Sequence, residues 1–151
     1  MSHPFTIRCA DQDDIIPIHR FLCLVAQPVL MAPIDAEDSI AGVADVIGGN
    51  AYALVAEING EIVGSLGLVT PVWWYNRKVP FFTDRWFFIY PQLAHLGVGA
   101  GLQAEAHATA ARAGADLVIN GKMVRRSRAS GPGIVYTSPT VLRPGEAATP
   151  S

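Results

Sequence analysis

The chain has 151 residues, of which 50% are hydrophobic and 16% are charged, and its formal net charge is −2. This balance excludes an intrinsically disordered chain and gives no electrostatic reason to expect a nucleic-acid partner. The N-terminus lacks a basic region followed by an apolar stretch, and charges interrupt the longest apolar runs, so we expect neither a secretory signal nor a membrane segment. We therefore expect one cytoplasmic domain over residues 1–143 and a disordered tail over residues 144–151.

Two cysteines, Cys9 and Cys23, are too few for a disulfide framework. They fall in a predicted strand and a predicted helix, where we expect buried free thiols that behave as small hydrophobes. The small number of charges also favours a partner that covers some apolar surface, and a homodimer would meet this expectation.

The first fifty residues predict a strand followed by two helices. Residues 5–9 are typical of a short strand, and polar residues then begin a helix in which apolar residues recur at helical spacing over 15–25. Either Asp35 or Asp38 can cap the second helix, which residues 48–50 (Gly-Gly-Asn) end.

A β-hairpin is the clearest secondary-structure signal. Residues 52–58 and 61–69 are both typical of strands, and the dipeptide Asn59-Gly60 separates them. Asn-Gly favours a hairpin because both turn residues need a positive φ. Gly64 and Gly67 weaken the second strand locally and predict a bulge or a close backbone approach.

A loop over residues 71–80 follows, and it contains the aromatic residues Trp73, Trp74 and Tyr75. A third strand is predicted over residues 84–90 and stops at Pro91. Residues 117–120 form a compact apolar segment of the kind that is buried in a sheet interior. The basic cluster over residues 122–128 is predicted to be a solvated helix face or loop, and residues 134–137 a final strand.

Three alternate glycines, Gly97, Gly99 and Gly101, stand between the third strand and a helix that extends to Ala113. Glycines allow a ligand to approach the backbone, and the first N–H groups of a helix, together with its dipole, form an anion site. The segment lacks the Gly-Lys-Ser/Thr ending of nucleotide loops and lies too late in the chain for a dinucleotide-binding unit. It therefore favours another kind of phosphate site on residues 96–101, the alternative being a glycine-rich helix start that serves packing only.

The order of strand, two helices, hairpin, strand, glycine turn, helix and strand resembles the GNAT superfamily of acyl-CoA N-acyltransferases over residues 5–120. Residues 91–99 look like the family's phosphate motif, which is Arg or Gln, two residues, Gly, one residue, then Gly or Ala. Gly97 and Gly99 fall on its glycines, whereas Ala94 replaces the Arg or Gln. The resemblance implies an α/β fold with a mixed, mostly antiparallel sheet, flanking helices and a central splay for acyl-CoA.

The resemblance also implies transfer of an acetyl group from acetyl-CoA to a primary amine of a small molecule or peptide by direct attack, without a metal. The pantetheine arm would lie beside the third strand, with backbone contacts at its end and phosphate contacts on the turn. A backbone N–H near Ile89 or Tyr90 could stabilise the oxyanion. The implied cofactor-binding residues are Phe88, Ile89, Tyr90, His95, Leu96, Gly97, Val98, Gly99, Ala100 and Asn120.

Three residues are candidates for acid–base chemistry. Asp84 and Glu57 could act as the general base, directly or through water, and the alternative for each is an ordinary surface carboxylate. The family's second-half helix, with the tyrosine that protonates the thiolate, is not recognisable after Asn120. Tyr136 is the one tyrosine downstream, and a plain strand residue is its alternative role.

Two further expectations concern the acceptor and the activity. Trp73, Trp74 and Tyr75 could form an apolar wall of the acceptor pocket, or else a hydrophobic clasp or dimer contact. The alternatives to an enzyme are a non-catalytic acyl-CoA-binding module, motivated by Ala94, and an interaction domain in which the glycines serve packing only.

Overall fold

A computed structural model of the chain describes residues 4–30, 33–49, 51–70, 78, 81–113, 117–125 and 134–142. The predicted aromatic cluster Trp73–Tyr75 and the predicted tail lie outside these residues. The elements in chain order are β1 (Thr6–Cys9), the short 3-10 helix η1 (Gln12–Asp14), α1 (Ile15–Leu30), α2 (Ala36–Gly48), β2 (Tyr52–Ile58), β3 (Glu61–Val69), β4 (Phe81–Ile89), the 3-10 helix η2 (Pro91–Leu96), α3 (Val98–Arg112), β5 (Leu117–Arg125) and β6 (Ile134–Leu142).

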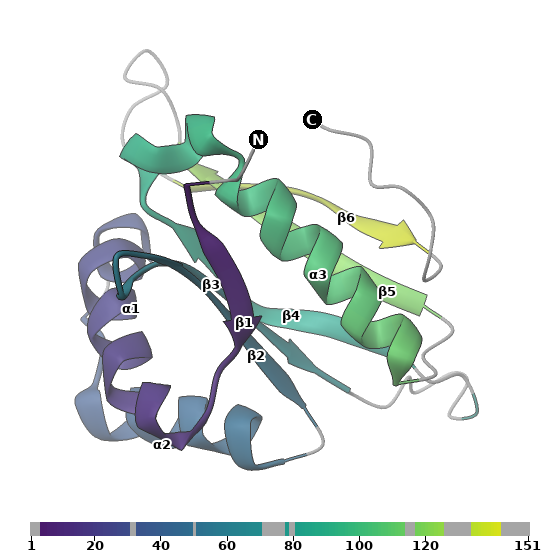
Figure 1. The fold of residues 1–151 in the computed structure, drawn as a ribbon, viewed down its shortest axis with the longest axis horizontal. Helices are drawn as coiled ribbons and strands as arrows, with labels where there is room; N and C mark the ends of the chain where they lie inside the picture. Colours follow the sequence, from purple (N-terminus) through teal and green to yellow (C-terminus); the bar gives the residue numbers. More distant parts are fainter. Residues whose placement is uncertain are drawn as a thin grey trace.

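The strands form one six-stranded sheet in the order β1-β2-β3-β4-β5-β6. Every neighbouring pair is antiparallel except β4 and β5, which are parallel. Parallel neighbours need a crossover connection, and η2 and α3 provide it (Figure 1). The prediction of a mixed, mostly antiparallel sheet flanked by helices is confirmed.

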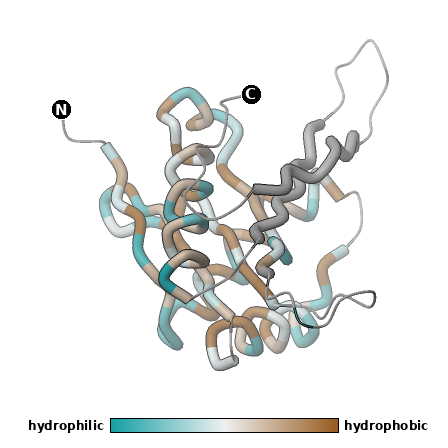
Figure 2. The backbone as a smooth tube through the Cα atoms, turned by 90° about the vertical axis from the view of Figure 1, so that its right-hand side faces the viewer, coloured by the Kyte–Doolittle hydropathy of each residue, from teal (hydrophilic) through white to brown (hydrophobic). Residues whose placement is uncertain are grey.

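Helices cover both faces of the central strands. On one face α3 packs through Val98 and Leu102 onto side chains of β2 and β3, and on the other face α1 and α2 pack onto Val55 and Trp86. Residues Val63–Leu68 of β3 are therefore buried without the alternation of a one-sided strand. Figure 2 shows hydrophobic (brown) residues both in the sheet and in the segments that pack against it.

The hairpin lies where the sequence predicts it. Asn59 and Gly60 have φ angles of +52° and +80°, the positive values that the turn requires. Gly67 does mark a close approach, because a Cβ there would lie 2.7 Å from three ring atoms of Trp86 on β4. Trp86 in turn donates its Nε1–H to Ser65 Oγ at 2.9 Å, which keeps the indole in this position.

Asp35 caps α2, since its carboxylate accepts a hydrogen bond from the N–H of Asp38 at 2.9 Å. The sequence left these two residues as alternatives, and the structure selects Asp35. Within the described residues, no helix combines the length and the apolar character needed to cross a membrane.

Three expectations from the sequence are wrong. Cys9 is exposed and Cys23 is half-buried, because β1 is an edge strand and the Cys23 side of α1 is partly open to solvent. The part of the basic cluster over Lys122–Arg125 belongs to β5, where it pairs with β6, and is neither a helix face nor a loop. The last strand extends to Leu142 because it pairs along nearly all of β5.

Candidate functional site

The pairing between β4 and β5 ends early. Within the described residues, the two strands pair only at Phe81–Thr83 with Leu117–Ile119. Beyond this point β4 continues for six residues to Ile89 and β5 continues to Arg125. The two parallel strands therefore separate towards their carboxyl ends, where open α/β sheets usually bind ligands.

The register of β4 decides which of its backbone groups face this opening. The N–H of Tyr90 donates to the carbonyl of Val63 on β3 at 2.9 Å. Because backbone direction alternates along an antiparallel pair, Phe88 also directs its N–H and C=O at β3, whereas Phe87 and Ile89 direct theirs away from β3. Among the residues predicted to make backbone contacts, Ile89 therefore faces the opening with its N–H and C=O. Phe87, which was not predicted, faces the opening as well.

The start of α3 provides amide donors at the same end of the sheet. Gly97 has a φ of +82° and ends η2, and the first bond within the helix runs from the N–H of Gly101 to the carbonyl of Gly97 at 2.9 Å. The N–H groups of Val98, Gly99 and Ala100 therefore have no partner inside the helix. No side chain caps this end and its first turn has no acidic residue, so the dipole and the amides together suit an anion.

The three alternate glycines have different roles. Gly97 supplies the left-handed backbone of the turn. A Cβ on Gly101 would lie 2.8 Å from Ile7 Cδ1, so this glycine allows α3 to pack on β1. A Cβ on Gly99 would lie 3.6 Å from Ile89 Cδ1, which is an ordinary contact, so neither packing nor backbone conformation requires a glycine there. The packing explanation therefore holds for Gly101 but does not account for Gly99.

The remaining predicted phosphate residues lie on η2. His95 and Ala94 are exposed, and Leu96 is half-buried. The carbonyl of Ala94 accepts a hydrogen bond from the N–H of Gly97 at 3.3 Å, so residue 94 contributes to the turn through its backbone. This contact is independent of the side chain, and the replacement of Arg or Gln by alanine leaves it unchanged.

Asp84 and Asn120 flank the point where the strands separate. Asp84 directly follows Thr83, and Asn120 directly follows Ile119, the last pair between β4 and β5. Asp84 is half-buried and lies opposite Leu68, on the face of the sheet that α3 covers. The structure thus brings a candidate base and a candidate cofactor residue to the base of the opening.

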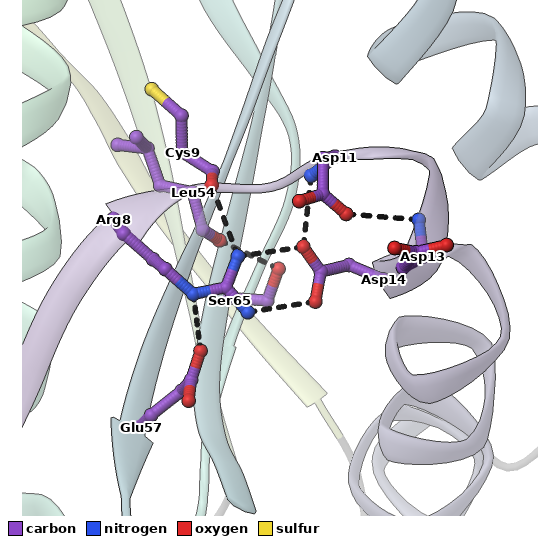
Figure 3. Close-up of polar contacts among 8 residues, drawn as sticks. All are labelled: Arg8, Cys9, Asp11, Asp13, Asp14, Leu54, Glu57 and Ser65. Atoms are coloured by element: carbon purple, nitrogen blue, oxygen red, sulfur yellow. Dashed lines mark hydrogen bonds and ion pairs between the residues drawn. The ribbon is translucent and has the colours of Figure 1, made fainter. Parts of the chain in front are cut away.

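Glu57 lies elsewhere. It is on β2, which is separated from β4 by β3, and its carboxylate accepts a hydrogen bond from Arg8 (Figure 3). Arg8 also donates two hydrogen bonds to Asp14, at 2.7 and 2.8 Å. The hydrogen bond with Asp14 raises the pKa of Arg8 above its usual value and lowers the pKa of Asp14. Glu57 therefore belongs to an ion-pair network that joins β1, β2 and η1.

Tyr136 lies on β6 in register with Met123 of β5. β5 separates it from β4, and in the part of the chain that the structure describes no helix follows α3. Its position in a regular antiparallel pair agrees with the alternative of a plain strand residue.

Several solved structures have the same fold. A GNAT family acetyltransferase from Brucella melitensis in complex with acetyl-CoA superposes with a TM-score of 0.65 and 18% identity, covering 98% of this chain and 93% of that chain. The Salmonella typhimurium protein yncA, solved with its cofactor acetyl-CoA, has a TM-score of 0.67 and 18% identity, with 98% of both chains covered. An aminoglycoside acetyltransferase from an uncultured soil metagenomic sample, solved with sisomicin, has a TM-score of 0.61 and 16% identity, covering 85% of this chain and 81% of that chain.

No protein-family model matches the sequence, and no curated protein matches it. At such low identities the similarity concerns the path of the backbone, and it extends over nearly the whole chain in two of the three structures. Together with the separated strands and the glycine turn described above, it shows that this chain has the fold of the GNAT acetyltransferases.

Proposed function

We propose that this protein transfers an acetyl group from acetyl-CoA to a primary amine of a small molecule or peptide. One observation carries the proposal: the opening between β4 and β5 and the uncapped start of α3 lie at the same end of the sheet. The Brucella and Salmonella proteins of the same fold were solved with acetyl-CoA, which supports it as the acyl donor. The cytoplasmic location and the homodimer expected from the composition belong to the same proposal.

The donor would bind through backbone groups. Its pyrophosphate would accept hydrogen bonds from the N–H groups of Val98, Gly99 and Ala100, where the helix dipole adds to the attraction. The pantetheine arm would then follow β4 and bond to the backbone of Phe87 and Ile89, which β3 does not occupy. Binding of this kind tolerates the alanine at position 94, because the donors are main-chain groups.

The chemistry needs an oxyanion donor and a route for one proton. The amine nitrogen attacks the thioester carbonyl, a tetrahedral oxyanion forms, and the C–S bond breaks as CoA thiolate leaves. Of the two oxyanion donors predicted from sequence, the N–H of Tyr90 already donates to Val63, and Ile89 lies beside the proposed phosphate site. The donor that we propose is therefore the N–H of Phe87, which also faces the opening and is nearer to Asp84 along β4. One such donor can contribute about 3–4 kcal/mol to transition-state stabilisation.

Asp84 is the base that we propose, directly or through water. An alkylamine has a pKa of about 10.4 and is mostly protonated at neutral pH, so a group that accepts its proton increases the reactive fraction. Asp84 lies at the base of the opening, whereas Glu57 lies on β2, which β3 separates from β4. A thiol has a pKa of about 8.5, so CoA can leave as the thiolate without a dedicated acid, and the mechanism does not require Tyr136.

A charge reversal on the first turn of α3 tests the donor site. Ala100 is exposed, and a glutamate there favours the helix through its dipole, so Ala100→Glu should fold normally. It should nevertheless repel the pyrophosphate by about 1–3 kcal/mol and weaken acetyl-CoA binding about tenfold or more in calorimetric titration. Ala100→Gln is the matched neutral control, and Ala104→Glu places the same charge on an exposed position one turn further along.

Two results would contradict parts of the proposal. If the wild-type protein does not bind acetyl-CoA at millimolar concentration, or if Ala104→Glu weakens binding as much as Ala100→Glu, the anion site is not at the start of α3. If acetyl-CoA binds normally but no amine releases free thiol, the non-catalytic acyl-CoA-binding module is the correct function.

A further inference from the structure

Arg85 occupies an irregular position on β4. The register between β3 and β4 shifts at this point, since Gly67 lies opposite Trp86 and Leu68 lies opposite Asp84. Arg85 is therefore the additional residue of a β-bulge and has no partner on β3. Bulges next to binding sites commonly turn a side chain away from the direction that the regular pleat would impose.

The surroundings of Arg85 make its exposure unusual. The next residue on β4, Trp86, is only 7% exposed, yet Arg85 is exposed. It is also the one basic residue in the sequence of β2, β3 and β4. Among the described residues, Arg85 takes part in none of the ion pairs, which join Arg8 and Arg112 to carboxylates. The fold therefore leaves this guanidinium available to a ligand.

Arg85 lies two residues beyond the last pair between β4 and β5, next to the proposed base Asp84. The phosphates of the donor would lie at the start of α3, and Arg85 precedes Ile89 by four residues, or about 13 Å of strand. On β4, Arg85 is thus near the reacting end of the proposed donor site and away from its phosphate end. Its ligand there would be the acceptor.

We propose that Arg85 binds a carboxylate of the acceptor, so that the substrate class is an amine that also carries a carboxylate, such as an α-amino acid. This inference rests on the proposed acetyl transfer. Guanidinium groups recognise carboxylates through two parallel hydrogen bonds, which fix orientation as well as affinity. Arg85 would hold the carboxylate while the neighbouring Asp84 accepts a proton from the amine, which places the nitrogen for attack on the thioester.

The test compares matched acceptors that differ only in the carboxylate. Amino acids with a primary amine are assayed against their carboxamides, and thiol release from acetyl-CoA gives kcat and KM for each. In at least one pair the wild-type protein should prefer the carboxylate. Arg85→Gln should lower kcat/KM for that acid by about 10- to 100-fold, mainly through KM, and leave the carboxamide nearly unchanged. Arg85→Lys should restore part of the preference, since it keeps the charge but loses the two-point geometry.

A control variant and a binding measurement separate this inference from the proposed function. Arg112→Gln removes the same charge from the far end of α3 and should leave the preference intact. Calorimetric titration of the acids and carboxamides into the complex with CoA reports acceptor binding without turnover. Normal acetyl-CoA binding with no carboxylate preference, in turnover or in binding, would overturn the role of Arg85 alone. Failure to bind acetyl-CoA would overturn both.

Discussion

Gly64 controls how closely the start of α3 approaches the sheet, and Gly64→Ala measures the free energy of that contact. A Cβ at this position would lie 2.8 Å from Val98 Cγ1, 3.0 Å from Ile89 Cγ2 and 3.0 Å from Leu102 Cδ1. Val98 and Leu102 are both 0% exposed, so neither can move aside without displacing other core atoms. Overpacking of this kind costs about 1–3 kcal/mol, and the lower entropy of the unfolded alanine variant offsets about 0.4–1 kcal/mol of it.

We therefore expect Gly64→Ala to lower the free energy of unfolding by about 1–2 kcal/mol, measured by urea denaturation with circular dichroism. The melting temperature should fall by about 2–8 °C for a chain of this size. Gly99→Ala is the matched control, because its Cβ would lie 3.6 Å from Ile89 Cδ1 and meets no forced contact. That variant should be as stable as the wild type or more stable.

A second substitution tests whether the cost arises from the contact with α3. Val98→Ala removes the Cγ1 atom that the new Cβ of Gly64→Ala would meet. The double variant should therefore be more stable than the sum of the two single effects implies, by about 1 kcal/mol. Additive effects, or a Gly64→Ala protein as stable as Gly99→Ala, would refute the packing argument. Acetyl-CoA affinity should also decrease in Gly64→Ala, because displacement of Val98 moves the amide donors of the proposed phosphate site.

Three other predictions concern stability. Gly42 is in the interior of α2 and a Cβ there would meet nothing within 4 Å, so Gly42→Ala should raise the free energy of unfolding by up to about 1 kcal/mol in urea titrations. Arg8 lowers the pKa of Asp14, so this carboxylate stabilises the protein above its unfolded pKa of about 3.9, and the contribution disappears as the pH falls through the lower folded value. Asp14→Asn should accordingly cost about 1–3 kcal/mol at pH 7 and make acid unfolding below about pH 4 less steep; an unchanged acid profile would contradict this role. Burial lowers the pKa of His107 in the folded protein. As the pH falls, this histidine is therefore protonated in the unfolded chain first, at about pH 6.5, and the free energy of unfolding should decrease below that pH. Melting curves of His107→Gln between pH 7.5 and pH 5 should show a smaller decrease, and a decrease equal to that of the wild type would show that other groups cause it.

Features that depend on neighbouring residues could be predicted from sequence. Asn59 and Gly60 form the expected turn because only their own backbone conformation is involved. The helix after Gly97 begins where the glycine turn predicts it, and its unpaired N–H groups are a property of any helix start. The order of such elements was sufficient to predict the fold class through its resemblance to the GNAT superfamily.

The candidate site could be predicted only in part, because the rest depends on register between strands. The resemblance to the GNAT superfamily implies that β4 borders the cofactor, but only the pairing of β4 with β3 shows that Ile89, and with it Phe87, faces the opening. Glu57 is a plausible base until the fold brings Arg8 to it from β1. Arg85 lies in a bulge that no local pattern predicts.

For the glycines of the turn, too, the sequence predicts one part and the tertiary structure decides the other. The sequence by itself determined that Gly97, Gly99 and Gly101 begin a helix after a strand, since spacing and helix-end preferences are local. Only the tertiary structure decided their separate roles, because a missing Cβ matters according to what lies opposite it. Ile7 of the distant β1 lies against Gly101, so a side chain at position 101 would have to displace Ile7, whereas Gly99 has room for a side chain and remains free for the proposed ligand.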